Sequence, residues 1–367
     1  MPSISFKAPL FYTPKHQKPK KEKNKGVVAG QYAQTLAMIP VGLATAKMTK
    51  MMKKASLLTE EQTQILDNAA QAGLKKAGLF GKVSIHKFDE VDIPKISLKE
   101  QASYIKSFYE SYKDKDPKTA IETLKNLSKK YLGNYSEKDE GALNAIKEAI
   151  AKNEAYSKML DNLKDDSIEK GIFDDILDVI ARGMGVMFKK GDNAGYLRDA
   201  NKIITPNKSL QTSVFHEIGH AMNNNFGTIT KTLQKNRATF QYVPALVLLV
   251  SLMNKRKTTD EKEQNDSIFQ KTGDFIKRNA GKLAFLSFVP TLAEEGIASL
   301  KGQNIAKELT KDGTLTKELF KKIKATNAFG FSTYTLSALA TALSIKFAIA
   351  VKDKIQQRAQ EKQEMRK

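Results

Sequence analysis

Two histidines and a glutamate near the middle of the chain have the types and spacing of a metal-dependent hydrolytic centre. Residues 212–222 read TSVFHEIGHAM, which places His216, Glu217 and His220 in an HExxH pattern. Histidines four positions apart on a helix lie one turn apart on the same face, so both imidazoles can bind one ion. The intervening Glu217 can then hold a water molecule at that ion and act as a general base. The alternative is a histidine pair that binds no metal.

The third ligand of such a centre must come from another part of the chain. With no cysteine in the sequence, His, Asp or Glu must supply every ligand, and a catalytic zinc ion commonly takes three. Asn223 and Phe226 stand where the extended HExxHxxGxxH motif needs Gly and His. Residues 293–299 read AEEGIAS inside an apolar stretch, where a charged pair needs a partner. Zinc coordination by this pair is one explanation, and a salt bridge to a basic neighbour is the other.

A helix from about Ser209 to the Asn-rich residues 223–225 is expected to carry the two histidines. Its apolar residues cluster on the face opposite them: Leu210, Val214, Ile218, Ala221 and Met222. Gly219 costs about 1 kcal/mol relative to Ala in a helix. We therefore expect another segment of backbone to approach closely at Gly219.

Short strands are predicted ahead of this helix. Residues 186–188 and 196–205 read as two strands joined by a Gly- and Asn-containing loop, and the second could pair with an extended substrate. Residues 82–88 alternate apolar and polar types and predict a further strand, with His86 as a surface residue rather than a ligand. An oxyanion donor could come from Tyr196, Arg198, Tyr242 or a backbone amide.

The expected fold is α+β and predominantly helical, with a zincin-like core built on a small sheet and the HExxH helix. We divide the chain into a basic arm with an apolar helix at 1–54, a helical region at 55–183, the core at 184–305 and C-terminal helices at 306–367. Within the helical region, helix starts are expected after Thr59 (a capping box with Gln62), after Ser97, at Pro117 and after Ser136, and the last helix is expected to end near Gly183.

The net charge of +21 favours anionic surfaces, and two uncharged stretches, 238–254 and 325–345, favour a membrane, where a span takes roughly 20 apolar residues. A third stretch, 283–293, is too short alone, and buried core helices are the alternative for all three. The uncharged stretch 26–46 in the N-terminal arm reads as an apolar helix, with a signal peptide as its alternative. Residues 352–367 are expected to form a solvated helix end. We expect membrane association with a cytoplasmic-side catalytic domain, and a cytoplasmic protein is the alternative.

The motif and the downstream carboxylates resemble the gluzincin zinc metallopeptidases, in which a Glu on a later helix completes HExxH. Residues 295–299, EGIAS, are similar to the E-G-F-A-S segment of the aminopeptidases and the E-x-x-A-D segment of membrane endopeptidases of the HtpX and CAAX-protease type. The long gap after His220 and its apolar stretches are closer to the membrane group. The resemblance spans residues 196–302 and implies that Glu295 is the third zinc ligand. Ser299 departs from it, because the membrane group has Asp there.

Helical geometry also favours Glu295 over Glu294 as the ligand. The residue three positions after Glu295 is the small Ala298, which leaves room for the HExxH helix to approach, whereas Glu294 would place Ile297 there. We expect Glu294 to accept a hydrogen bond from a ligand histidine, partly replacing the missing Asp.

The expected activity is hydrolysis of peptide bonds in a peptide or protein substrate by zinc-activated water. One alternative is a non-catalytic zinc-binding protein that retains the fold. Another is a basic membrane-surface or nucleic-acid-binding protein with a chance HExxH. Nucleic acid is not the expected partner, because recognised binding motifs and aromatic platforms are absent from the sequence.

Overall fold

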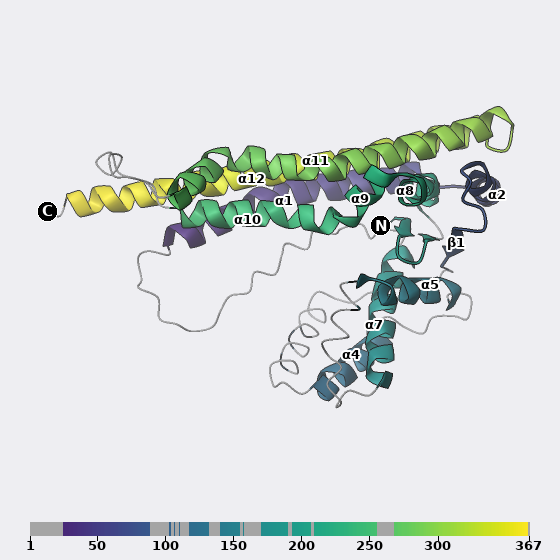
Figure 1. The fold of residues 1–367 in the computed structure, drawn as a ribbon, viewed down its shortest axis with the longest axis horizontal. Helices are drawn as coiled ribbons and strands as arrows, with labels where there is room; N and C mark the ends of the chain where they lie inside the picture. Colours follow the sequence, from purple (N-terminus) through teal and green to yellow (C-terminus); the bar gives the residue numbers. More distant parts are fainter. Residues whose placement is uncertain are drawn as a thin grey trace. The chain divides into compact units, whose positions relative to one another are not determined.

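The computed structural model of the chain describes residues 25–88, 103, 106, 110, 117–131, 140–154, 157, 170–189, 193–206, 209–254 and 268–365. It is predominantly helical with one three-stranded sheet in the described part, which confirms the α+β, mostly helical part of the expected fold (Figure 1). The helices are α1 (Lys25–Ala55), α2 (Glu60–Lys76), α4 (Pro117–Tyr131), α5 (Glu140–Ala151), α7 (Lys170–Lys189), α8 (Val214–Phe226), α9 (Thr228–Lys235), α10 (Arg237–Met253), α11 (Ile268–Lys311) and α12 (Lys317–Glu364). The strands are β1 (Ser84–Lys87), β2 (Gly195–Leu197) and β3 (Lys202–Thr205), and a short 3-10 helix, η2, covers Gln211–Ser213.

The described residues form two compact units. The first unit contains Met52–Asn225 and Ala298–Asn327, and the second contains residues 25–51, Phe226–Ile297 and residues 328–365. Each unit therefore combines segments that are far apart in the sequence.

The sheet of the first unit has the order β1-β3-β2, with β1 parallel and β2 antiparallel to β3. The prediction of a strand within 82–88 is confirmed by β1. The predicted strand at 196–205 is instead two strands joined by a tight turn, where Asn201 adopts φ 56°. Asn tolerates this left-handed conformation better than most residues, which permits the turn.

Helix α7 corrects two expectations. It continues through Gly183 to Lys189, so Gly183 does not end it, and residues 186–188 are helical rather than a strand. Phe188 and Ala181 of α7 are buried against α5 and the sheet, where Phe88 stacks with Phe188 at a ring-centroid distance of 6.1 Å. Tertiary burial of this helix face outweighs the low helix propensity of Gly.

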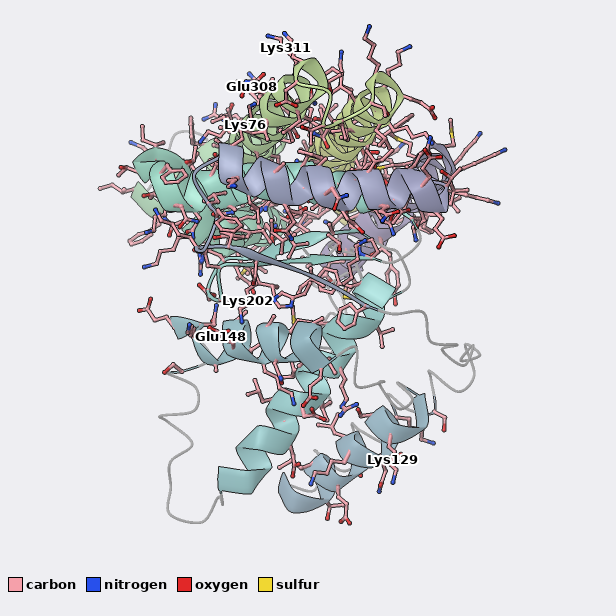
Figure 2. The ribbon with its side chains drawn as sticks, turned by 90° about the vertical axis from the view of Figure 1, so that its right-hand side faces the viewer. Lys76, Lys129, Glu148, Lys202, Glu308 and Lys311 are labelled. Carbon is pink, nitrogen blue, oxygen red and sulfur yellow. The ribbon has the colours of Figure 1, made fainter. Side chains whose placement is uncertain are left out.

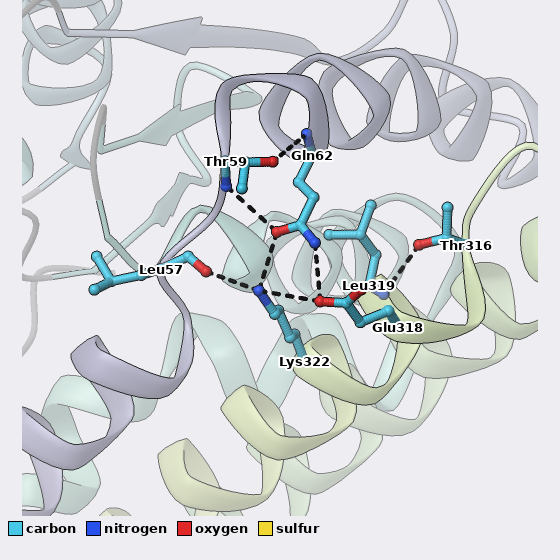
Figure 3. Close-up of polar contacts among 7 residues, drawn as sticks. All are labelled: Leu57, Thr59, Gln62, Thr316, Glu318, Leu319 and Lys322. Carbon is cyan, nitrogen blue, oxygen red and sulfur yellow. Dashed lines mark hydrogen bonds and ion pairs between the residues drawn. The ribbon is translucent and has the colours of Figure 1, made fainter.

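The start of helix α2 is as predicted. Thr59 and Gln62 form a capping box in which each side chain accepts a hydrogen bond from the other residue's backbone N–H. Gln62 also donates to Glu318 of α12 at 2.9 Å, and Lys322 donates to the carbonyl of Leu57 at 2.8 Å (Figure 3). The cap thus also joins α2 to the beginning of α12.

Two of the other expected helix starts can be assessed. Helix α4 begins at Pro117, as predicted, and α5 begins at Glu140, shortly after Ser136. The expected start after Ser97, like Ser136 itself, lies outside the described residues.

The core of the first unit lies between α2, α8 and the parts of α11 and α12 that belong to this unit. Its buried side chains include Leu66, Phe215, Ile218, Ile305 and Leu319. These residues are the apolar faces of their helices, so the helix pattern that predicts α8 also explains why it is buried.

The second unit is built from α9, α10 and the remaining parts of α1, α11 and α12. Its core includes Leu248, Ala284 and Ile345. Glycines bring its helices into close contact: a Cβ on Gly30 would lie 2.8 Å from Leu252, and one on Gly281 would lie 2.7 Å from Lys346. Small residues at helix contacts are typical of helices that pack within a membrane.

Three helices of the described part are long and apolar enough to cross a membrane: Gly26–Ala55, Ile268–Lys311 and Lys317–Lys362. The uncharged stretch at 283–293, short by itself, is part of the 44-residue helix α11. The stretch in α10 is shorter, Thr239–Met253. Length and composition therefore indicate membrane association.

The expected solvated helix end at 352–367 is wrong for its first residue. Lys352 is fully buried and donates hydrogen bonds to the carbonyls of Ser251 and Asn254 at the end of α10. A buried ammonium requires such partners, and helix C-termini supply free carbonyl groups.

Candidate metal centre

Helix α8 presents its HExxH residues together because its other face is buried. Val214, Phe215, Ile218 and Ala221 pack into the core of the first unit. Residues 216, 217 and 220 therefore share the remaining side of the helix. Glu217 and His220 are 1% and 0% exposed, and His216 is half-buried.

The ligand atoms of His216, Glu217 and His220 all lie within 4.8 Å of one another, so this group could hold a metal ion. The two Nε2 atoms are 2.9 Å apart, and the imidazole planes are nearly perpendicular, at 84°. Two ring nitrogens this close cannot both present lone pairs to each other without a proton or a cation between them. The nitrogen and oxygen donor set suits zinc, for which His and carboxylate ligands are common.

Glu217 is held by the edge of the sheet. Its Oε2 accepts a hydrogen bond of 2.7 Å from the backbone N–H of Tyr196 in β2. Burial disfavours the charged form of the Glu217 carboxyl, but nearby positive charge and the hydrogen bond from the Tyr196 amide outweigh it, so the net effect lowers its pKa. The sheet thus orients the carboxylate that the sequence assigns as the base.

Two of the side chains proposed as oxyanion donors are engaged elsewhere. The Tyr196 hydroxyl contacts Asn201 and accepts a hydrogen bond of 2.8 Å from Asn224, and burial raises the pKa of this phenol to about 12. The Arg198 guanidinium donates to Asp199 at 2.7 and 2.9 Å. Tyr242 belongs to the second unit and is 70% exposed.

Helix α8 crosses α11 at backbone contact within the first unit. A Cβ on Gly219 would overlap the carbonyl oxygen of Ala298, and a Cβ on Gly302 would overlap that of Phe215. The expected close approach at Gly219 is therefore confirmed. The small Ala298 lies at this crossing, as its position predicts.

The crossing brings Ser299 to the HExxH motif. Its Oγ lies 3.0 Å from Nδ1 of His216, on the side of the ring opposite Nε2. The sequence shows Ser299 only as a departure from the family pattern. Its contact with His216 depends on two helices 83 positions apart in the chain, and no local pattern encodes it.

Glu294 and Glu295 lie in the second unit and are 1% and 0% exposed. Arg237, at the start of α10, forms an ion pair with Glu295 and lies 3.8 Å from Glu294. Its guanidinium also lies over the ring of Tyr334, 5.5 Å from the centroid. The salt bridge expected as the alternative explanation for the buried carboxylates is therefore present, and sequence reasoning did not identify Arg237 as its partner.

His86 does not belong to a metal-holding group within the described residues. It is half-buried in β1, with Nε2 2.9 Å from the Ser84 hydroxyl. Its pKa is lowered, first by burial and then by the charge of Lys202.

No family model, no curated protein and no solved structure matches the chain.

Proposed function

We propose that this protein is a zinc-dependent metallopeptidase with a zincin-like centre. His216, His220 and Glu295 hold the ion, and Glu217 is the general base. The observation that carries the proposal is the convergence of His216, Glu217 and His220 on one side of α8, with their ligand atoms within 4.8 Å. Nε2 of each histidine faces the other, as two ligands of one ion would.

Helical spacing supports Glu295 as the third ligand. Residues four apart on a helix lie one turn apart on the same face, and Glu295 is four positions before Ser299 on the continuous helix α11. Ser299 in turn contacts His216. Coordination also gives a reason for burying this carboxylate completely, although its ion pair with Arg237 is a purely structural alternative.

Zinc held at these ligands would supply Lewis-acid polarisation of the scissile carbonyl and activation of a water molecule. Glu217 then accepts the proton from that water as the carbonyl carbon gains its new bond to oxygen. The same carboxyl delivers the proton to the leaving nitrogen as the C–N bond breaks, so the proton count is unchanged. The Tyr196 amide, which donates to Oε2, keeps the carboxylate oriented during this transfer.

The substrate proposed is an extended peptide or protein segment. Among the described strands β2 lies at an edge of the sheet, and it directs the Tyr196 N–H toward Glu217. A peptide pairing with this edge would run beside the proposed base, in the manner of strand addition.

The second unit is proposed to lie in a lipid bilayer. Large apolar side chains form stripes with helical spacing on exposed faces, and these apolar stripes are Val28, Tyr32, Leu36, Ile39 and Leu43 on α1, Tyr242, Leu246, Leu249 and Met253 on α10, and Leu339, Leu343 and Phe347 on α12. Gly30 and Gly281 lie at close contacts between its helices, while these large apolar side chains face outward, as they do toward lipid. Pro40, Pro244 and Pro290 inside helices are also better tolerated in membrane spans than in soluble helices.

The first unit is placed on the cytoplasmic side in this proposal. The net charge of +21 favours the anionic cytoplasmic leaflet over the opposite one.

Substitution of Glu217 by Gln tests the proposed activity. The variant should keep zinc and its fold, because both imidazoles are unchanged, but lose at least ~10²-fold in peptide hydrolysis. The measurement compares cleavage of a denatured protein substrate by zinc-loaded wild type and variant in detergent. Equal hydrolysis by both would reject Glu217 as the base. Zinc binding without hydrolysis in the wild type would favour the non-catalytic zinc-binding protein.

A further inference from the structure

The contact between Ser299 and His216 has a defined geometry. Ser299 is 7% exposed, and its helix is held against α8 by the backbone contacts at Gly219 and Gly302. A substitution of either glycine would push the helices apart, so the position of the Ser299 hydroxyl follows from the helix crossing. The hydroxyl lies 3.0 Å from Nδ1 of His216.

The direction of this hydrogen bond follows from two facts together: the short distance between the two imidazoles and the lone pair that a zinc ligand must present. Nε2 of His216 and Nε2 of His220 are 2.9 Å apart, so without a metal one of them must donate a proton to the other. A zinc ligand must present a lone pair at the coordinating nitrogen, which for His216 requires the proton to reside on Nδ1. Ser299 Oγ is placed to accept that Nδ1–H.

We infer that Ser299 is the positioning residue of the metal centre, an inference that rests on the proposed zinc site. His216 carries its proton on Nδ1 and donates it to Ser299 Oγ. Its Nε2 therefore presents a lone pair toward His220, which donates from Nε2 in the metal-free protein. Zinc held by both Nε2 atoms would require the His220 proton to reside on Nδ1 instead of Nε2, so this neutral ring would change tautomer with no net loss of a proton. The neutral hydroxyl of Ser299 orients the His216 ring without adding negative charge to the centre.

The first experiment is a direct observation on metal-free wild-type protein. With only four histidines in the chain, selective ¹⁵N-histidine labelling and long-range ¹H–¹⁵N correlation spectra resolve each ring tautomer. The expected result is His216, assigned with a His216→Gln variant, as the Nδ1–H tautomer. A His216 ring protonated on Nε2 alone would overturn the inference, whatever the variants below show.

The second experiment measures zinc affinity by competition with a chelator. Ser299→Ala should weaken zinc binding by the 10–100-fold typical of lost partners of ligand histidines. Ser287→Ala is the matched control, because Ser287 lies on the same helix and its hydroxyl donates to the Ala284 carbonyl one turn earlier in that helix. Its zinc affinity should match the wild type. Equal affinities for all three proteins would overturn the role of Ser299, whereas absence of zinc from wild type would overturn the proposed function itself.

Discussion

At the scale of single residues, the candidate centre consists of two imidazoles and a carboxylate on one side of α8, with the Ser299 hydroxyl of α11 beside one of the imidazoles. The sequence alone identifies His216, Glu217 and His220, because residues spaced in this way on one helix must lie on the same side of it. Ser299 and Arg237 are not recognisable, because each meets its partner through contacts between helices distant in sequence. Local patterns therefore predict the motif, and only packing reveals what orients it.

The choice between the two adjacent carboxylates can be tested by single substitutions. Glu295→Ala should abolish most zinc binding, because it removes a direct ligand, whereas Glu294→Ala should weaken it by about 10–100-fold. Zinc content and chelator competition on both variants check this order. The reverse order would assign the ligand to Glu294, and equal wild-type affinity in both would leave the pair as an ion-pair site for Arg237 alone.

At the scale of secondary-structure elements, helix boundaries were less predictable than helix types. The capping box at Thr59 and the start at Pro117 follow local rules and are correct. The helix end predicted at Gly183 is wrong, because burial of α7 against α5 allows the helix to continue through a residue of low helix propensity. The turn inside the strand predicted at 196–205 was not foreseen, because nothing in the composition of this segment indicates that Asn201 adopts a left-handed backbone conformation.

The surroundings of two helical glycines, Gly219 in α8 and Gly183 in α7, predict opposite effects for their substitution by Ala. Gly219→Ala should destabilise the protein by about 1–3 kcal/mol, because the new Cβ would meet the Ala298 backbone, which cannot move aside alone. Gly183→Ala should stabilise by about 0.4–1 kcal/mol, because the described residues outside its own helical turn leave the space within 4 Å of its Cβ position open, and the unfolded chain loses conformational freedom. Denaturant unfolding in detergent measures both. A neutral or stabilising Gly219→Ala would contradict the close crossing.

The contact between α5 and β3 predicts a pH dependence. Hydrogen bonds from Lys152 and Lys202 lower the pKa of Glu148 to about 2, and Lys202 and Glu148 lie next to each other in Figure 2. The pKa in the folded protein is below the unfolded value of 4.5, so the contribution is present above pH 4.5 and is lost as the pH falls toward 2. The melting-temperature difference between wild type and Glu148→Gln should therefore shrink between pH 5 and pH 2.5. A difference that grows on acidification would contradict this assignment.

At the scale of the whole molecule, discontinuous segments make up each unit. Domain boundaries predicted from composition divide the chain into consecutive segments. In the structure, helices α11 and α12 each contribute to both units, so no such division could give them. The apolar stretches were visible in the sequence, but their outward-facing stripes were not, since exposure depends on which helix faces pack together.

Membrane association is the prediction that follows from the second unit. The full-length protein should sediment with membranes, resist extraction by alkaline carbonate and dissolve only in detergent, because its apolar stripes need an apolar environment. Fractionation of cells producing the protein checks this. Recovery as a monodisperse soluble species without detergent would instead assign the long helices to a buried core.

The most direct test of the central claim is the zinc content of purified protein after zinc loading and dialysis. Elemental analysis should find about one zinc per chain in the wild type and none in a His216→Ala/His220→Ala double variant, because both nitrogen ligands are then missing. A His86→Ala variant should retain its zinc, since His86 lies in no metal-holding group of the described residues. No zinc in the wild type, or equal zinc in the wild type and the double variant, would contradict the metal centre proposed on α8.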